Sequence, residues 1–376
     1  MEALLLLIAL TTIFGVVVVP AIRRRRERQE LERAAATAEA GTTRPVFGVR
    51  LGKDGDGVGA PTATGLVPVD QLDVRLPGPD PQLVAALEEV QRTQNWRPAG
   101  QLLALTDDRE LRWQRVQSLA GAAAMELARS RAAGDTSGAA WLRSWRADEP
   151  NDAGGSQVYA QFLVWQAMAD PSSADHRIIL EEARTVCAEA AKLAPEDPTP
   201  YITELFIARG LSYRPADFEA LWSNVTQRDP AHMGAHLAAL PYWSEKWHGS
   251  RKQADAFATA AAASAPEGSL LAALPLFAVY DHLPDVQLSP SLYTGAVVSD
   301  AVEAAQFAVN TARTGHPVEP HVRHLLLCFL VRAERYPEAA EQVRAIDGYV
   351  GAIPWVDGEN PAREYATYRA LAIAGE

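Results

Sequence analysis

Histidine and cysteine side chains are the first candidates for chemistry in this sequence. His321, His324 and Cys328 follow one another at intervals of three and four residues. On a helix they would share one face, as the ligands of a metal ion must. Residues 325–327 and 329–330 around them are strongly apolar, and the sequence offers no clear fourth ligand. His232 and His236 form a second pair, but the glutamate of a metalloprotease helix is missing. We interpret all of them as structural or surface residues, and we predict no metal, cofactor or catalytic residue.

An aromatic turn near the middle of the chain is the second candidate. The sequence reads YWSEKWHGS over residues 242–250, so three large aromatic rings fall within six residues. Rings of this kind anchor partners in protein interfaces, and neighbouring polar groups add hydrogen bonds. The predicted partner-binding residues are Tyr242, Trp243, Glu245, Trp247 and His248.

A purely local interpretation of the same turn is also open. Trp247 would pack between helices, Gly249 would permit a tight turn, and Ser250 would cap the following helix. Both interpretations use the same residues, and they differ only in whether the rings are buried or exposed.

The turn also carries a resemblance to a known family. Trp247, Gly249, Ser250 and Phe257 match an uncharacterised bacterial, actinobacterial-like family of helical-repeat proteins that is catalogued as a domain of unknown function. In that family a tryptophan, a glycine and a serine close a turn before an alanine-rich helix that contains a phenylalanine. The resemblance implies a tetratricopeptide-like fold and no established activity.

A regular spacing of prolines predicts the elements that would position these residues. Pro195, Pro230 and Pro266 are 35 and 36 residues apart, and each closes a similar phrase. Such a period is typical of stacked helix-turn-helix units, because one unit cannot bury its apolar face without neighbours. Residues 140–350 therefore resemble divergent tetratricopeptide repeats. The end of a second helix is indicated by Ala188, Ala191, Leu193 and Pro195, and the start of the next by Tyr201.

The apolar pattern is helical from residue 82 onward, and we predict an all-α superhelical repeat array over 82–376. The expected helices are 81–94, 97–105, 107–130, a short helix containing Trp141 and Trp145, 156–168, 174–193, 199–208, 215–227, 231–246, 250–265, 269–280, 300–314, 319–333, 337–346 and 361–374.

Three segments precede the array. Residues 3–22 carry no charge and are long enough to span a bilayer as a helix, so we predict a single transmembrane anchor within 1–22. Residues 23–40 are predicted to continue as a basic juxtamembrane helix, and residues 41–81, rich in glycine and proline, to form a flexible tether. Anionic lipid headgroups would attract the arginines, which are Arg23, Arg24, Arg25, Arg26 and Arg28.

Charge and cysteine content indicate the compartment. Basic residues after the apolar run remain in the cytoplasm, so the C-terminal body is expected there. The formal net charge is −12, and because segment 23–28 contributes +4 (five arginines, one glutamate), the rest carries −16. A body so acidic repels phosphate backbones, so no nucleic acid partner is expected. The two cysteines provide no disulfide framework, as is usual in a reducing compartment.

The sequence thus predicts a membrane-anchored helical scaffold that binds another protein at the cytoplasmic face without catalysis. Two alternatives remain open. A metal-dependent or other enzyme would require the histidine and cysteine face at 321–328 to converge with carboxylates. A purely structural array would associate with copies of itself.

Overall fold

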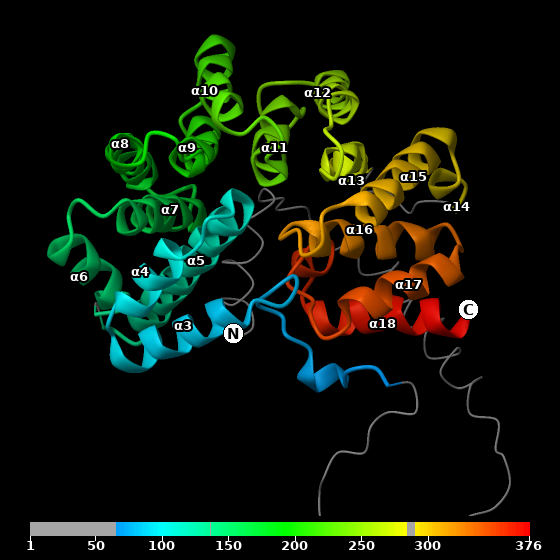
Figure 1. Cartoon of the computed structure of the whole chain (residues 1–376), viewed down its shortest axis with the longest axis horizontal. Coiled ribbons are helices and arrows are strands. Elements are labelled where there is room, and N and C mark those ends of the chain that lie inside the picture. The colour runs from blue at the N-terminus through cyan, green and yellow to red at the C-terminus, as the bar shows by residue number, and fades with distance from the viewer. Residues whose placement is uncertain (1–64, 136, 284–289) are drawn as a thin grey trace, which may run out of the picture.

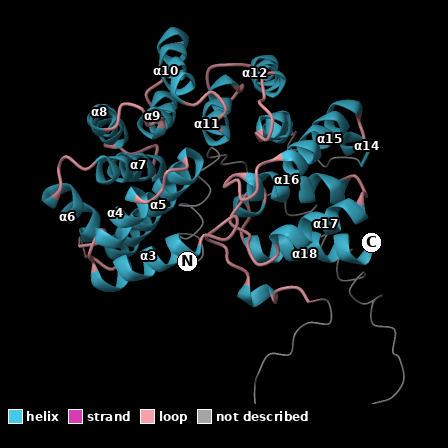
Figure 2. Ribbon diagram, viewed as in Figure 1, coloured by secondary structure: helices cyan, strands magenta, loops and turns pink. Residues whose placement is uncertain are grey.

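The structure is a computed structural model, and it describes residues 65–135, 137–283 and 290–376. Within these residues every named element is a helix, as Figure 2 shows. The all-helical prediction is therefore confirmed for this part of the chain. The elements are η2 (Val69–Gln71), α3 (Pro81–Thr93), α4 (Arg97–Ala104), α5 (Arg109–Ala132), α6 (Ala140–Asp148), α7 (Ala153–Ala169), α8 (His176–Leu193), α9 (Thr199–Gly210), α10 (Pro215–Arg228), α11 (Met233–Ala239), η3 (Leu240–Trp243), α12 (Arg251–Ala263), η4 (Leu271–Ala273), α13 (Leu274–Asp281), α14 (Pro290–Tyr293), α15 (Ala296–Thr311), α16 (Glu319–Arg332), α17 (Tyr336–Ile346), η5 (Trp355–Asp357) and α18 (Pro361–Ala374).

Local sequence signals set most helix boundaries. The three prolines of the period lie just beyond α8, α10 and α12, where a proline ring cannot continue the helix. Helix starts are fixed by polar caps: Asp108 accepts from the Leu111 amide at the start of α5, and Ser250 accepts from the Gln253 amide at the start of α12. These caps satisfy backbone donors that a helix leaves free in its first turn.

The helices follow one another around an arch, with α3 to α5 at one end and α16 to α18 at the other (Figure 1). Contacts run between alternate elements along the inner side, from α5 to α7, α9, α11 and α13. Helices α8, α10 and α12 lie outside this row and contact their chain neighbours. An inner row backed by an outer row lets each helix bury an apolar face on both neighbours.

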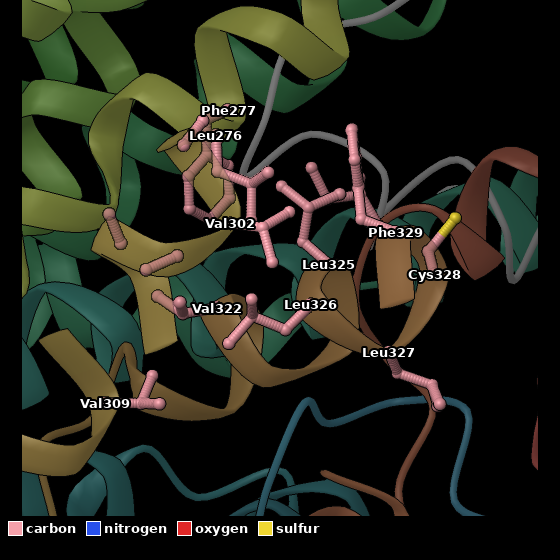
Figure 3. Packing of buried hydrophobic residues seen from close by; sticks show 14 of the residues in the cluster. Leu276, Phe277, Val302, Val309, Val322, Leu325, Leu326, Leu327, Cys328 and Phe329 are labelled. Carbon is pink, nitrogen blue, oxygen red and sulfur yellow. The ribbon is translucent and has the colours of Figure 1, made fainter. Parts of the chain in front are cut away.

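The interior consists of two apolar clusters. One extends from α3 to α11 and η3 and includes Trp113, Trp145 and Phe206, and the other extends from α11 to α18. Figure 3 shows the second cluster around α16, where Val322 and the leucines at 325–327 fill the core. Trp243 and Phe257 pack against both clusters, so the aromatic turn lies where the two halves meet.

The two ends of the arch are joined by residues 65–80. Asp73 donates its amide to the Gly348 carbonyl (2.8 Å) and accepts from the Val350 amide (2.8 Å). The Gly351 amide donates to the Leu76 carbonyl at 2.9 Å. This stretch was predicted to belong to the flexible tether 41–81, and that boundary needs correction. Gly and Pro content suggested a linker, but the backbone groups of the segment find partners far along the chain.

A buried histidine secures the same segment. The Nε2 atom of His324 donates to the Pro77 carbonyl at 3.0 Å, and its Nδ1 atom accepts from the indole of Trp355 at 2.9 Å. At the segment's other end, Arg369 donates to the Val67 carbonyl at 2.7 Å. Both ring nitrogens of His324 are therefore used in holding the fold together.

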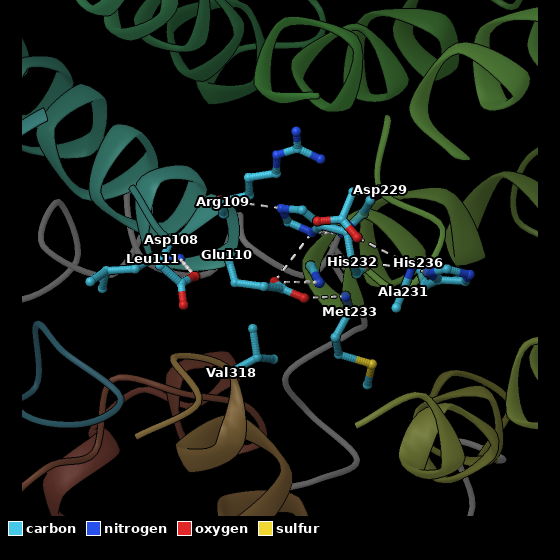
Figure 4. A network of polar contacts seen from close by, with 12 residues as sticks. Asp108, Arg109, Glu110, Leu111, Asp229, Ala231, His232, Met233, His236 and Val318 are labelled. Atoms are coloured by element: carbon cyan, nitrogen blue, oxygen red, sulfur yellow. Dashed lines mark hydrogen bonds and ion pairs between the residues drawn. The ribbon is translucent and has the colours of Figure 1, made fainter. Parts of the chain in front are cut away.

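A polar network, drawn in Figure 4, ties α5 to α11. The buried carboxylate of Glu110 accepts from the Met233 amide and, at 3.1 Å, from the Gly234 amide. His232 lies beside it, with Nδ1 3.2 Å from the carboxylate, and Nδ1 accepts from the Ala235 amide at 3.0 Å. Burial raises the pKa of Glu110, while His232 and the two amides lower it. These side chains cap the start of α11.

One predicted helix differs from the structure, and three predicted segments are not tested by it. The helix predicted over 231–246 ends at Ala239 and continues only as the short η3, because Pro241 removes a backbone donor. The predicted anchor 1–22, basic helix 23–40 and tether residues 41–64 lie outside the described residues. In the part of the chain that the structure describes, no helix combines the length and apolar character needed to span a bilayer.

Candidate functional site

The aromatic turn begins in η3, and Tyr242 lies on the buried side of the turn. This residue is fully buried. Its ring stacks on Phe218 with centroids 3.7 Å apart, and its hydroxyl donates to the Tyr213 carbonyl at 2.7 Å. Tyr242 was predicted to contact a partner, but in this position it supports the turn from within the core.

The end of the turn, at Gly249 and Ser250, has the geometry that the local interpretation predicts. A Cβ atom at Gly249 would lie 2.0 Å from the carbonyl oxygen of Trp243, so only glycine fits there. The Ser250 amide donates to the same Trp243 carbonyl at 2.9 Å, and its hydroxyl caps α12. This geometry fixes the path of the chain between η3 and α12 and raises residues 245–248 to the surface.

The outer part of the turn is open. Glu245 and His248 are exposed, and Trp247 retains 39% of its surface. In the same turn, the indole nitrogen of Trp243 and the hydroxyl of Ser244 are buried and have no hydrogen-bond partner among the described residues. Buried polar atoms nearly always have partners, so the unsatisfied pair here is unusual.

Arg209, near the end of α9, is the most unusual residue of this region. It is 2% exposed, and none of its three guanidinium nitrogens has a hydrogen-bond partner among the described residues. The guanidinium lies 4.8 Å from the ring centroid of Phe206 and 5.6 Å from that of Trp247. Burial lowers its pKa to about 10, although attraction to Asp281 acts in the opposite direction.

Two charged side chains on neighbouring elements complete the site. Lys246 donates to Asp281 at the end of α13, with Nζ 3.2 Å from Oδ1. The other carboxylate oxygen of Asp281 and the Nε2 atom of His282 are buried without a partner in the described part of the chain. Arg209, Lys246 and Asp281 together carry one formal positive charge, and the exposed Glu245 of the same turn adds one negative charge outside them.

We name Arg209, Trp243, Ser244, Lys246 and Trp247 the arginine site. Their polar groups are mostly donors: a guanidinium, an indole N–H, a hydroxyl and an ammonium group. A carboxylate has two oxygens that accept several such bonds, and a guanidinium binds it with a matching planar geometry. The arrangement is therefore suited to bind an anion with planar oxygens.

The other predicted candidates are not brought into this site. His324 is held by Pro77 and Trp355, and burial lowers the pKa of His321 to about 3. Cys328 and Cys187 are buried thiols that are not joined in a disulfide. Among the described residues no group of three or more His, Cys, Asp or Glu side chains is arranged to hold a metal ion.

Sequence reasoning missed Arg209, and the reason is clear from its position. It falls in the last turn of a helix, where a basic residue normally faces water and interacts with the helix dipole. Here Arg209 is instead buried, with its guanidinium over the rings of Phe206 and Trp247. The phrase Trp247–Gly249 was the one signal that pointed toward this part of the molecule.

Comparisons with known proteins found no relative of this chain. No protein-family model matches the chain, and neither a curated protein nor a solved structure matches it.

Proposed function

We propose that this protein is a membrane-anchored scaffold with tetratricopeptide-like repeats, which binds a carboxylate-bearing segment of another protein at the cytoplasmic face. The observation that carries the proposal is the buried guanidinium of Arg209, which has no hydrogen-bond partner among the described residues.

The energetic argument starts from the desolvation of Arg209. A buried charge without hydrogen bonds destabilises a fold by several kcal/mol. The rings of Phe206 and Trp247 offset part of this, since a cation over an aromatic face gains about 0.5–2 kcal/mol. Asp281 contributes attraction but no hydrogen bond to Arg209. A residue that weakens the isolated fold is best explained by a bound state in which its donors are used.

The route of entry is given by Trp247. Its ring covers one side of the guanidinium and is 39% exposed, so a small displacement of this surface side chain uncovers Arg209. A partner carboxylate arriving there would meet the guanidinium first, with the Lys246 ammonium group on the same turn. Exposed Glu245 and His248 would flank the entering segment, and they remain predicted partner-binding residues.

Membrane attachment in the proposal is supported by the sequence of residues 3–22 and the arginines that follow. We expect the full chain to remain in carbonate-washed membranes, whereas a chain lacking residues 1–22 should be released. Recovery of the full chain in the soluble fraction would contradict this part of the proposal.

Binding is tested with a display library of random peptides and the purified full chain. We expect the selected peptides to share one Asp, Glu or C-terminal carboxylate, and its replacement by the amide to weaken binding roughly 100-fold, as for a buried charged hydrogen bond of about 3 kcal/mol.

Two protein variants test whether binding depends on Arg209 itself or only on the net charge of the protein. Arg209→Met should abolish selection of these peptides, whereas Lys252→Met removes the same charge from an exposed position of α12 and should leave binding intact. Peptides that bind the Arg209→Met protein as tightly as the original chain would refute the proposed site.

A further inference from the structure

A cavity of about 80 Å³ lies between the start of the described chain, α3, α5 and α7. Its walls are mainly apolar and include Leu76, Leu87, Ala122, Met125 and Trp165. The space exceeds that of a single water molecule several-fold. Arg75, Glu88 and Gln91 form an exposed rim, so the cavity opens toward the surface.

One polar side chain, Gln117 of α5, lines this cavity from its buried side. Gln117 is 3% exposed, and neither its amide nitrogen nor its amide oxygen has a hydrogen-bond partner among the described residues. Its own backbone carbonyl accepts from the Trp165 indole at 3.5 Å. The carboxamide therefore offers an unused donor and an unused acceptor within an apolar wall.

The chemistry of these groups selects a ligand. A carboxamide pairs with a donor and an acceptor that lie side by side, as do the backbone N–H and C=O of one residue in an extended peptide. A charged group would be desolvated without a counter-charge at Gln117. Apart from Ser118 and the charged and polar rim, the remaining walls are apolar. We propose that the cavity binds an apolar side chain of an extended peptide, with the backbone N–H and C=O of the same residue hydrogen-bonded to Gln117.

This site is separate from the arginine site in chemistry and in residues. The two are nevertheless linked through aromatic rings, since Trp165 meets Phe206 edge-on with centroids 5.5 Å apart, and Arg209 lies over Phe206. Peptide binding in the cavity does not require Arg209 to bind a carboxylate. The Arg209→Met protein should therefore bind a neutral peptide probe like the original chain.

Methionine methyl groups provide a local readout of binding. The chain has four methionines, of which Met125 lines the cavity while Met168 and Met233 do not. We label the methyl groups of the full chain with carbon-13 and titrate it with N-acetyl-leucine N-methylamide, recording NMR spectra. The Met125 resonance should shift while those of Met168 and Met233 remain in place. The alanine analogue, which has the peptide groups but lacks the apolar side chain, should bind at least tenfold more weakly, consistent with the loss of three methylene-sized groups.

Two variants test the role of the Gln117 amide and of the volume of the cavity. Gln117→Met keeps the side-chain length and should weaken binding about tenfold or more, the effect of losing a buried hydrogen-bonded pair. Gln161→Met is the control, because this buried amide of α7 also has an unpartnered nitrogen but does not line the cavity. Ala122→Leu fills the space and should remove the Met125 shift. The proposal is overturned by an unmoved Met125 resonance, or by equal affinities of the Gln117→Met and Gln161→Met proteins.

Discussion

Replacing Arg209 with methionine is expected to stabilise the protein while abolishing its carboxylate binding. Burial lowers the pKa of this guanidinium from 12.5 to about 10. A shift of this size corresponds to about 3 kcal/mol of destabilisation of the charged form. Methionine has a similar length, retains contact with the rings of Phe206 and Trp247, and leaves no unpaired donor. We expect the free energy of unfolding to rise by about 3 kcal/mol.

The matched control is Arg228→Met, since Arg228 also stacks on a ring, with its guanidinium 4.1 Å from the centroid of Tyr201. Its nitrogens, unlike those of Arg209, donate to the Pro195 carbonyl at 2.6 Å and to the Tyr201 hydroxyl at 2.9 Å. Removing it should therefore destabilise the fold, by about 1–3 kcal/mol. Urea unfolding followed by circular dichroism compares the two variants with the original chain. If Arg209→Met destabilises the fold as Arg228→Met does, Arg209 is a structural residue.

The free energy of unfolding is expected to rise in Arg209→Met and to fall in Arg228→Met. This contrast illustrates which features a sequence can reveal. Helix positions follow from local patterns, and α18 begins and ends at the predicted residues because proline and the last alanines mark its limits. The turns after α8, α10 and α12 follow from the proline period for the same reason. By contrast, both arginines lie in the last turn of a helix and look alike in sequence.

The features that could not be predicted depend on contacts between distant residues. Residues 65–80 read as a linker because glycine and proline disfavour regular structure, yet Asp73 pairs with a segment near residue 349. Tyr242 was placed on a binding surface because aromatic residues are common in interfaces, but Phe218 of α10 buries it. Gln117 resembles any polar position of a helix until α3 and α7 enclose it. In each case the deciding partner lies on another element.

Acidification should destabilise the protein over a pH range that the pKa values of its buried histidines determine. Burial lowers the pKa of His236, His316 and His324 to about 4 and that of His321 to about 3. In the unfolded chain the same groups titrate near 6.5. The folded state thus binds fewer protons than the unfolded state between these values, and its stability is complete above about pH 6.5 and decreases as the pH falls toward 4. At pH 5 the loss is roughly 2 kcal/mol for each histidine. Glu110 acts in the opposite direction, because its raised pKa favours protonation in the folded state.

His324 allows this mechanism to be tested at one position. Its Nδ1 atom accepts from the Trp355 indole, so a proton there would place two donors face to face. In His324→Gln the amide oxygen can accept from Trp355 and the amide nitrogen can donate to the Pro77 carbonyl, without titrating. We compare urea unfolding at about pH 7.5 and about pH 5, and we expect the variant to lose roughly 2 kcal/mol less than the original chain. His248→Gln, on the exposed turn, should lose as much as the original chain. Equal losses in the two variants would show that protonation of His324 does not drive the acid transition.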